Sequence, residues 1–292
     1  MNRRDLIKKV SLGAGALTLG NLVSGFSSLK DFELQELQLK GNVNHSACYW
    51  CYNTIPLDDF AKACAEMGLK GIDLLDPDQW KIAQKYGLTC SLGTDHFVDI
   101  GNGFNNPENH GHLQKNYKEL IEKAADSGLE QVIVFSGNRN GMDDTIGIEN
   151  CAKGLDPLVK LAEKMGITIV MELLNSKVNH KDYQCDHTPW GVNLVDKIDS
   201  SHFKLLYDIY HMQIMEGDVI ATIKEYHSYF AHYHTGGVPG RHEINNSQEL
   251  NYSAIIKAIV DTGFTGFVAQ EFIPTYPDKL SALREGILIC DV

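Results

Sequence analysis

An alternation of short β-rich runs with longer helical patterns, which continues from residue 41 to the end of the chain, is the feature that most constrains the fold. The β-rich runs are eight in number and recur at intervals of roughly 20 to 40 residues. We expect strands over residues 42–48, 71–75, 88–92, 131–135, 168–173, 204–208, 231–234 and 267–271. Such an alternation predicts βα units built on a parallel sheet.

Helical segments lie between the predicted strands, and several end in a glycine, which is typical of a helix C-terminus. Examples are expected over residues 57–67, 109–127, 155–165 and 252–262. The glycines that follow them are Gly68, Gly128, Gly166 and Gly263. These glycines therefore mark four of the expected helix ends.

Eight strands, each followed by a helix, in about 250 residues predict a (β/α)8 TIM barrel, an α/β fold that forms a single domain over residues 41–292. The alternative is an open doubly wound sheet. That fold usually has a glycine-rich phosphate loop after an early strand, and neither a G-x-G-x-x-G nor a Walker motif follows any predicted strand. The barrel is therefore favoured, and its active site is expected at the carboxyl ends of the strands.

Residues 1–30 break this pattern and resemble an export signal. The pair Arg3 and Arg4 precedes an uncharged, weakly apolar stretch, which is typical of twin-arginine signals. A membrane anchor is the alternative, but it needs roughly 20 strongly apolar residues, and glycines interrupt this stretch. We expect residues 31–40 to be a linker, no stable membrane insertion after processing, and a periplasmic protein, or a cytoplasmic one if the leader is not functional.

The charge balance argues against nucleic acid as a partner. The chain has 26 basic and 38 acidic side chains, a formal net charge of −12, which repels a phosphate backbone or an anionic membrane surface. An anionic substrate would therefore have to be attracted by a local feature of the site. Association with further copies of the chain is left open by the sequence.

Seven cysteines are present, an odd number with scattered spacing that does not suggest a disulfide framework. Cys48 and Cys51 have the spacing of a redox pair or half of a zinc site, but no second C-x-x-C pair completes a structural zinc site. We therefore expect most of the cysteines to be small core residues, and the role of the Cys48 and Cys51 pair stays open.

Ligand-type side chains stand at the carboxyl ends of the last four predicted strands. They are Glu172, Asp208, His234 and Glu271, one from each strand. Glu172 is the one charged residue of its apolar strand, and a buried carboxylate is costly unless it is paired or binds a metal. Because consecutive strand ends meet at one rim of a closed barrel, we expect the four side chains to converge there.

This convergence predicts a metal site. Taken singly, a strand-end aspartate can cap the next helix, and a histidine can be an ordinary polar residue. Together, three acids at one rim would repel one another and raise each other's pKa without a cation. Three carboxylates and one imidazole favour Mn²⁺ or Mg²⁺, with Co²⁺ or Zn²⁺ as alternatives.

The chain from about residue 41 onward resembles the xylose-isomerase-like barrels, and within them the hydroxypyruvate isomerases. The resemblance is densest in four segments that contain the strand ends and one further loop. They are Met-Glu-Leu-Leu-Asn-Ser at 171–176, Asp-Ile-Tyr-His-Met at 208–212, Gly-Val-Pro-Gly-Arg-His-Glu-Ile at 237–244 and Gly-Phe-Val-Ala-Gln-Glu-Phe at 266–272. The four-ligand set is shared with sugar 3-epimerases, so it identifies the superfamily more strongly than the substrate.

The resemblance implies a role for each site residue. By motif position, Glu172 and Glu271 bind the metal and also move a proton, while Asp208 and His234 complete the ligand set. His211 and Arg241 match the segments that contact substrate. A guanidinium grips a carboxylate in a bidentate fork, so Arg241 suits an anionic substrate.

The predicted function is a divalent-metal-dependent aldose-ketose isomerase that converts hydroxypyruvate to 2-hydroxy-3-oxopropanoate through an enediolate, with two glutamates as acid and base. The expected partner is a small hydroxy-keto acid or a sugar. Alternatives are a free-sugar 3-epimerase or isomerase, and an exported carbohydrate-binding barrel without turnover. Cleavage of damaged DNA by a similar barrel is disfavoured by the charge of −12.

Trp50, Trp80 and Trp190 wall the pocket or pack in the core, and we expect core packing for at least two of them.

Overall fold

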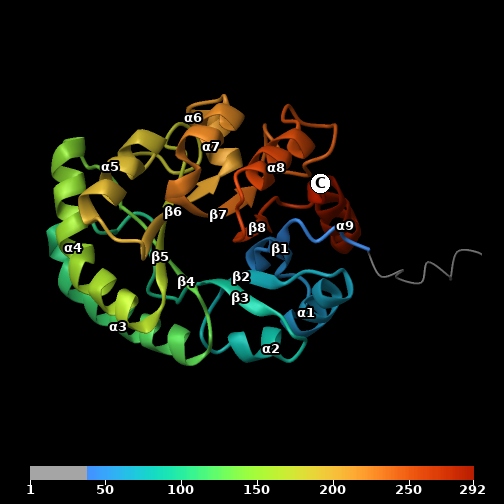
Figure 1. Ribbon diagram of the computed structural model, residues 1–292, viewed down its shortest axis with the longest axis horizontal. Coiled ribbons are helices and arrows are strands. Elements are labelled where there is room, and N and C mark those ends of the chain that lie inside the picture. Colours follow the sequence, from blue (N-terminus) through green and yellow to red (C-terminus); the bar gives the residue numbers. More distant parts are fainter. Residues whose placement is uncertain (1–37) are drawn as a thin grey trace, which may run out of the picture. The chain divides into compact units, whose positions relative to one another are not determined.

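The structure, a computed structural model, describes residues 38–292, and its strands form one parallel sheet enclosed by helices (Figure 1). The strands are β1 (Asn44–Ala47), β2 (Gly71–Leu75), β3 (Thr89–Gly93), β4 (Gln131–Val134), β5 (Thr168–Leu173), β6 (Phe203–Asp208), β7 (Phe230–Thr235) and β8 (Phe267–Gln270). All eight strands predicted from the sequence are present, which confirms the TIM barrel. The predicted export signal, and most of the predicted linker, lie outside the described residues.

Nine α-helices and three short 3-10 helices lie within the described residues. The α-helices are α1 (Leu57–Glu66), α2 (Trp80–Gln84), α3 (His110–Asp126), α4 (Asp144–Met165), α5 (Thr188–Ile198), α6 (Ile209–Met215), α7 (Val219–Tyr226), α8 (Tyr252–Asp261) and α9 (Lys279–Cys290). The 3-10 helices are η2 (Tyr49–Tyr52), η3 (Pro107–Asn109) and η4 (His227–Tyr229). None of the helices in this part of the chain is long and apolar enough to cross a membrane.

The barrel closes between its first and last strands. β1 pairs with β8 in parallel register, with Asn44 opposite Phe267, and every later strand pairs with its predecessor back to β2. Between β1 and β2 the ladder shortens to a bridge between Cys48 and Asp73. Lys40 lies against the other end of the chain, where its backbone N–H donates to Asp291 at 3.0 Å.

The predicted helix ends are confirmed, and one predicted helix start is wrong. The four glycines expected at helix ends all have left-handed backbone conformations, with φ between 73° and 83°.

Helix α4 begins at Asp144 instead of residue 155, because the Asp143 side chain caps it by accepting from the backbone N–H of Thr145 at 2.8 Å. Gly147 and Gly154 lower the helix propensity of this first half. They are retained for close packing, since a Cβ at Gly147 would meet Gln184 and one at Gly154 would meet His110.

Side chains alternate between the barrel interior and the helix layer along each strand. On β7, Tyr233 packs outward against Phe264, with ring centroids 4.8 Å apart, and against Phe230 at 5.8 Å. His232 and His234 on the same strand face the interior instead, where their rings meet edge to face at 5.2 Å. The apolar core therefore lies mainly between sheet and helices, while the barrel interior carries polar side chains toward the site.

Candidate active site

Strand register brings the four predicted metal ligands together. Each of them offers one side-chain atom, and these atoms lie within 4.8 Å of one another, in a buried cluster formed by Glu172, Asp208, His234 and Glu271. Asp208 lies opposite His234 in the β6–β7 ladder, whereas Glu172 lies opposite Leu206, two residues before Asp208. This stagger is the expected consequence of strand tilt in a closed barrel.

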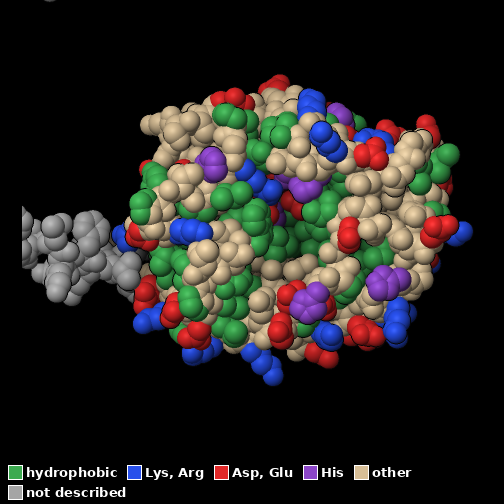
Figure 2. Space-filling model, turned by 180° about the vertical axis from the view of Figure 1, so that it is seen from behind, with side chains coloured by type: hydrophobic (Ala, Val, Ile, Leu, Met, Phe, Trp, Pro, Cys, Tyr) green, Lys and Arg blue, Asp and Glu red, His purple; other side chains and the backbone are tan. Residues whose placement is uncertain are grey.

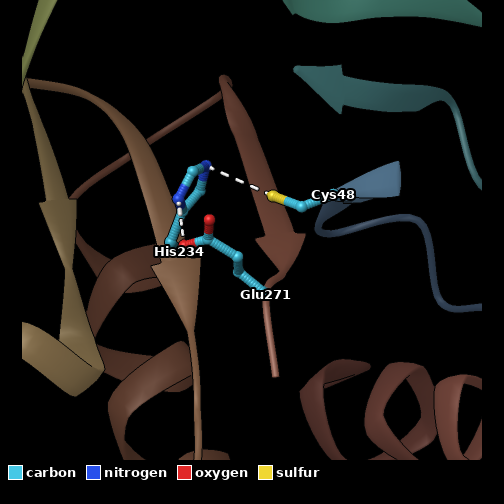
Figure 3. A group of neighbouring side chains, drawn as sticks. All are labelled: Cys48, His234 and Glu271. Atoms are coloured by element: carbon cyan, nitrogen blue, oxygen red, sulfur yellow. Dashed lines mark hydrogen bonds and ion pairs between the residues drawn. The ribbon is translucent and has the colours of Figure 1, made fainter. Parts of the chain in front are cut away.

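His234 lies between Glu271 and Cys48 (Figure 3). Its Nδ1 lies 2.8 Å from Glu271 Oε2 and 3.5 Å from Glu172 Oε1. Its Nε2 faces the opposite way, 3.2 Å from Asp73 Oδ2 and 3.8 Å from the Cys48 thiol. One ring nitrogen therefore faces the predicted ligands, and the other faces the interior of the barrel.

Arg241 lies against the same carboxylates. Its Nη2 donates to Glu271 Oε2 at 2.5 Å and to Asp208 Oδ2 at 3.3 Å. The guanidinium carbon also lies 5.2 Å from the ring centroid of Trp50 and 5.4 Å from that of Tyr210, in cation–π range. The guanidinium thus supplies positive charge where three acidic side chains meet.

The backbone of the loop after β7 explains how Arg241 reaches this position. Arg241 has φ of 59° and follows Gly240 with φ of 96°, so the chain turns sharply at these two residues. The Arg241 N–H donates to Gly237 O at 2.8 Å, and the Arg241 carbonyl accepts from Ile273 N at 2.6 Å. A Cβ on Gly237 would lie 2.5 Å from Glu243 O, so this close approach requires glycine.

His211 lies beside the cluster at the start of α6. Asp208 caps this helix by accepting from the backbone N–H of His211 at 3.0 Å. Asn175 donates to His211 Nδ1 from its side chain at 2.6 Å, which leaves the proton on Nε2. That Nε2 is buried, lies 3.6 Å from Asp208 Oδ2, and has no hydrogen-bond partner among residues 38–292. Burial, reinforced by Arg241, holds the pKa of His211 well below its ordinary value, so the ring is a neutral donor.

Burial and mutual repulsion raise the pKa of two of the three carboxyl groups in the cluster. Burial raises the pKa of Asp208 to about 8, with Glu271 and Glu172 adding to the effect and Arg241 opposing it. Burial also raises the pKa of Glu172, and the charge of Glu271 adds to it. For Glu271, burial acts in the same direction, but Arg241 and His234 lower its pKa well below the ordinary value.

This donor set fits a divalent cation. Glu172 Oε1 is buried without a hydrogen-bond partner among residues 38–292, although a buried carboxylate oxygen is costly to leave unpaired. Three carboxylates and an imidazole nitrogen are ligands that divalent ions accept, and their charges repel one another without a cation. In Figure 2, acidic, basic and histidine side chains gather at a hollow near the middle of one face. A separate hollow of about 570 Å³ lies between α4 and α5, on the outside of the barrel.

The structure adds a layer of polar residues that the sequence analysis missed. Asp73 on β2 is fully buried and contacts Ser91, His232 and His234. Burial acts to raise the pKa of Asp73, but the two histidines lower it below the ordinary value. The signal was present, since Asp73 is a lone carboxylate in an apolar strand, as Glu172 is, and His232 precedes His234 by two positions on the same face.

The remaining sequence-predicted residues divide between site and core. Trp50 is 39% exposed and donates from Nε1 to Glu271 Oε1 at 2.8 Å, so it lies at the site. Trp80 and Trp190 are buried in the core, which confirms the expectation for two of the three tryptophans. All seven cysteines lie in the described part of the chain, and they are buried and free.

Comparisons with known proteins agree with this architecture. Residues 56–288 match the family described as xylose isomerase-like TIM barrel. Hydroxypyruvate isomerase of Escherichia coli is 29% identical over 142 residues, 43% of this chain and 55% of that protein. 2-Oxo-tetronate isomerase of Cupriavidus necator is 29% identical over 233 residues, 75% of this chain and 87% of that protein.

Several of the other curated relatives are matched over about half of their own length. Among solved structures, the AP endonuclease of family 2 from Brucella melitensis superposes with a TM-score of 0.75, at 23% identity, over 82% of this chain and 96% of that one. At this identity the superposition shows a shared fold. With the family match over most of the chain, it establishes that the protein belongs to the xylose isomerase-like TIM barrel family.

Proposed function

We propose that the protein is a divalent-metal-dependent isomerase that converts hydroxypyruvate to 2-hydroxy-3-oxopropanoate. The observation that carries the proposal is the contact of the Arg241 guanidinium with Glu271, which shares a buried cluster with Glu172. Two carboxylates suit proton transfer between adjacent carbons, and an adjacent arginine suits a substrate that is itself a carboxylate. The substrates named in two relatives, hydroxypyruvate and 2-oxo-tetronate, are both 2-oxo acids.

The reaction needs one proton to leave C3 and one to reach C2. A glutamate takes the C3 proton, and the electron pair left behind forms the enediolate of the substrate. The second glutamate delivers a proton to C2, while the hydroxyl proton moves from O3 to O2. We assign these two roles to Glu172, on β5, and Glu271, directly after β8.

The other site residues bind and orient the substrate. Arg241 binds the substrate carboxylate through N–H groups that Glu271 and Asp208 do not occupy, among them its buried Nε, which has no hydrogen-bond partner among residues 38–292. The unpartnered Nε2–H of His211 donates to a substrate oxygen. Glu172, Asp208, His234 and Glu271 would hold Mn²⁺ or Mg²⁺, with Co²⁺ or Zn²⁺ as alternatives. When bound, that ion supplies Lewis-acid stabilisation of the negative charge that develops on the substrate oxygens.

Deuterium exchange tests this function directly. Metal-stripped protein, reloaded with Mn²⁺, is incubated with hydroxypyruvate in D₂O, and NMR follows deuterium entry and product formation. We expect metal-dependent exchange that is lost in Glu271→Gln. Glu216→Gln is the matched control. Glu216 caps α5 by accepting from the backbone N–H of Thr188 at 2.6 Å, and it does not belong to the cluster of proposed metal ligands.

Two outcomes would contradict the proposal in different ways. Exchange with free ketoses but not with hydroxypyruvate would identify a free-sugar isomerase or 3-epimerase that uses the same metal ligands. Mn²⁺ binding without exchange on any of these compounds would identify a carbohydrate-binding barrel without turnover.

A further inference from the structure

We infer that Asp73 is a positioning residue of the metal centre, which fixes the imidazole of His234 so that Nδ1 is presented to Glu172 and Glu271. The inference deepens the proposed function and rests on it, because it concerns how a proposed ligand is held. Asp73 comes from β2, on the opposite side of the barrel closure from the four proposed ligands, and it contacts none of the substrate-facing residues named above.

The two ring nitrogens of His234 contact different groups. Nδ1 faces the carboxylates of Glu271 and Glu172, at 2.8 Å and 3.5 Å. Nε2 faces Asp73 Oδ2 at 3.2 Å. A ligand histidine commonly donates its second ring N–H to a carboxylate, which selects the tautomer and the ring orientation. The geometry at Asp73 is of this kind.

The surroundings of Asp73 make it an acceptor toward His234. The carboxylate is fully buried, and its Oδ2 also lies 2.6 Å from His232 Nε2, while the Ser91 hydroxyl donates to Oδ1. An ionised carboxylate can only accept hydrogen bonds, so Nε2 of His234, which faces Asp73 Oδ2, carries a proton and its Nδ1 is left to act as the ligand atom.

Further side-chain contacts and one backbone bridge hold Asp73 and its partner His232 in place. His232 Nδ1 lies 2.9 Å from Gln131 Oε1, and Gln131 in turn donates from Nε2 to Ala231 O at 3.0 Å. His232 therefore links Asp73 on β2 to Gln131 on β4. A backbone bridge ties Asp73 to Cys48, the residue directly after β1, and the Cys48 thiol lies beside His234 (Figure 3).

The test is the Mn²⁺ affinity of Asp73→Asn, measured without substrate from the free-ion EPR signal. An asparagine of the same shape can turn an N–H toward Nε2, which would move the ring proton to Nδ1. We expect the Kd for Mn²⁺ to rise by about 10- to 100-fold, the usual effect of losing such a partner. Ser91→Ala is the matched control, because it removes another hydrogen bond of Asp73 and leaves the contact with His234; its Kd should stay within about threefold.

A second readout separates positioning from simple loss of structure. In ¹⁵N-histidine NMR of the Mg²⁺-loaded protein, His234 should be protonated at Nε2 in the unmodified chain and in Ser91→Ala, and at Nδ1 in Asp73→Asn. A proton on Nδ1 in the unmodified chain would overturn the inference, even if Asp73→Asn failed to fold. An unchanged Kd in Asp73→Asn, or equal losses in both variants with lowered melting temperatures of the metal-free proteins, would also overturn it.

Failure of the proposed function gives a different result. If the unmodified protein does not bind Mn²⁺ at all, the metal centre itself is wrong. If it binds Mn²⁺ and does not exchange hydroxypyruvate, the substrate assignment is wrong, and the Kd comparison between Asp73→Asn and Ser91→Ala still decides the role of Asp73.

Discussion

Metal binding by this protein should weaken steeply as the pH falls from 8 to 6. Asp208 is fully buried, and burial raises its pKa to about 8 in the metal-free protein. Below that pH the carboxyl group carries a proton and is neutral. A metal ion must displace this proton to use Asp208 as a ligand, so the apparent affinity rises with pH.

The size of the effect follows from the competition between one proton and the metal. With a pKa of about 8, half of the Asp208 side chains are ionised at pH 8 and about one in a hundred at pH 6. The Kd for Mn²⁺ should therefore increase about 50-fold over these two pH units. Burial acts to lower the pKa of His234, but Cys48, Glu271 and Asp73 raise it well above the ordinary value. Since a second proton competes there, 50-fold is a lower bound.

Calorimetric and EPR titrations check this expectation. Metal-free protein is titrated with Mn²⁺ at pH 6, 7 and 8, and calorimetry in buffers of different ionisation enthalpy counts the protons released. We expect at least one proton to leave per ion at pH 7. A Kd that changes less than threefold between pH 6 and pH 8, or binding at pH 7 without proton release, would refute the reasoning. Asp208→Asn provides the control, since residue 208 can then no longer titrate.

Three further perturbations test other parts of the account. In Arg241→Ala, kcat/KM for hydroxypyruvate should fall about 100-fold, because charge-assisted hydrogen bonds of about 1.5–3 kcal/mol are lost; an equal loss with a free ketose in the same steady-state assay would contradict a role in carboxylate binding. Gly103→Ala should lower the free energy of unfolding by about 2 kcal/mol or more in urea denaturation, since its Cβ would lie 2.3 Å from Gly137 N and Phe135 O. Gly111→Ala in α3 has open space and should be neutral or stabilising, by up to about 1 kcal/mol; equal destabilisation of both would contradict the packing argument. Replacing both Arg3 and Arg4 by lysine should retain the protein in the cytoplasm of a bacterial host on cell fractionation, and an unchanged periplasmic pool would argue against a twin-arginine signal.

The barrel could be predicted from the sequence because each strand and helix is encoded locally. Apolar runs bounded by glycines mark the strands and helix ends, and repeating that pattern eight times leaves few other folds. The start of α4 could not be predicted from local patterns. Gly147 and Gly154 have low helix propensity, and the reason for a glycine at each position is close packing against residues distant in the sequence.

The polar residues below the site were harder to predict because their partners are distant in the sequence. Asp73 is a lone carboxylate in an apolar strand, but His232, its closest histidine partner, lies 159 residues further along, and no local pattern links the two. The contact of Arg241 with the carboxylates of the proposed metal site depends on a backbone turn at Gly240 and Arg241. Motif position placed Arg241 near substrate, but spacing alone does not show which carboxylates it meets.

The pairing of β1 with β8 constrains how the chain can fold during synthesis. β1 leaves the ribosome before the other strands, yet the strand that covers its edge, with Phe267 opposite Asn44, emerges after all of them. Until then the nascent chain exposes an unpaired strand edge, a site for wrong pairing between chains. Glu271 follows directly after β8, so barrel closure and the last member of the donor cluster arrive together. A chain interrupted before β8 would be both an open sheet and a protein without its complete metal centre.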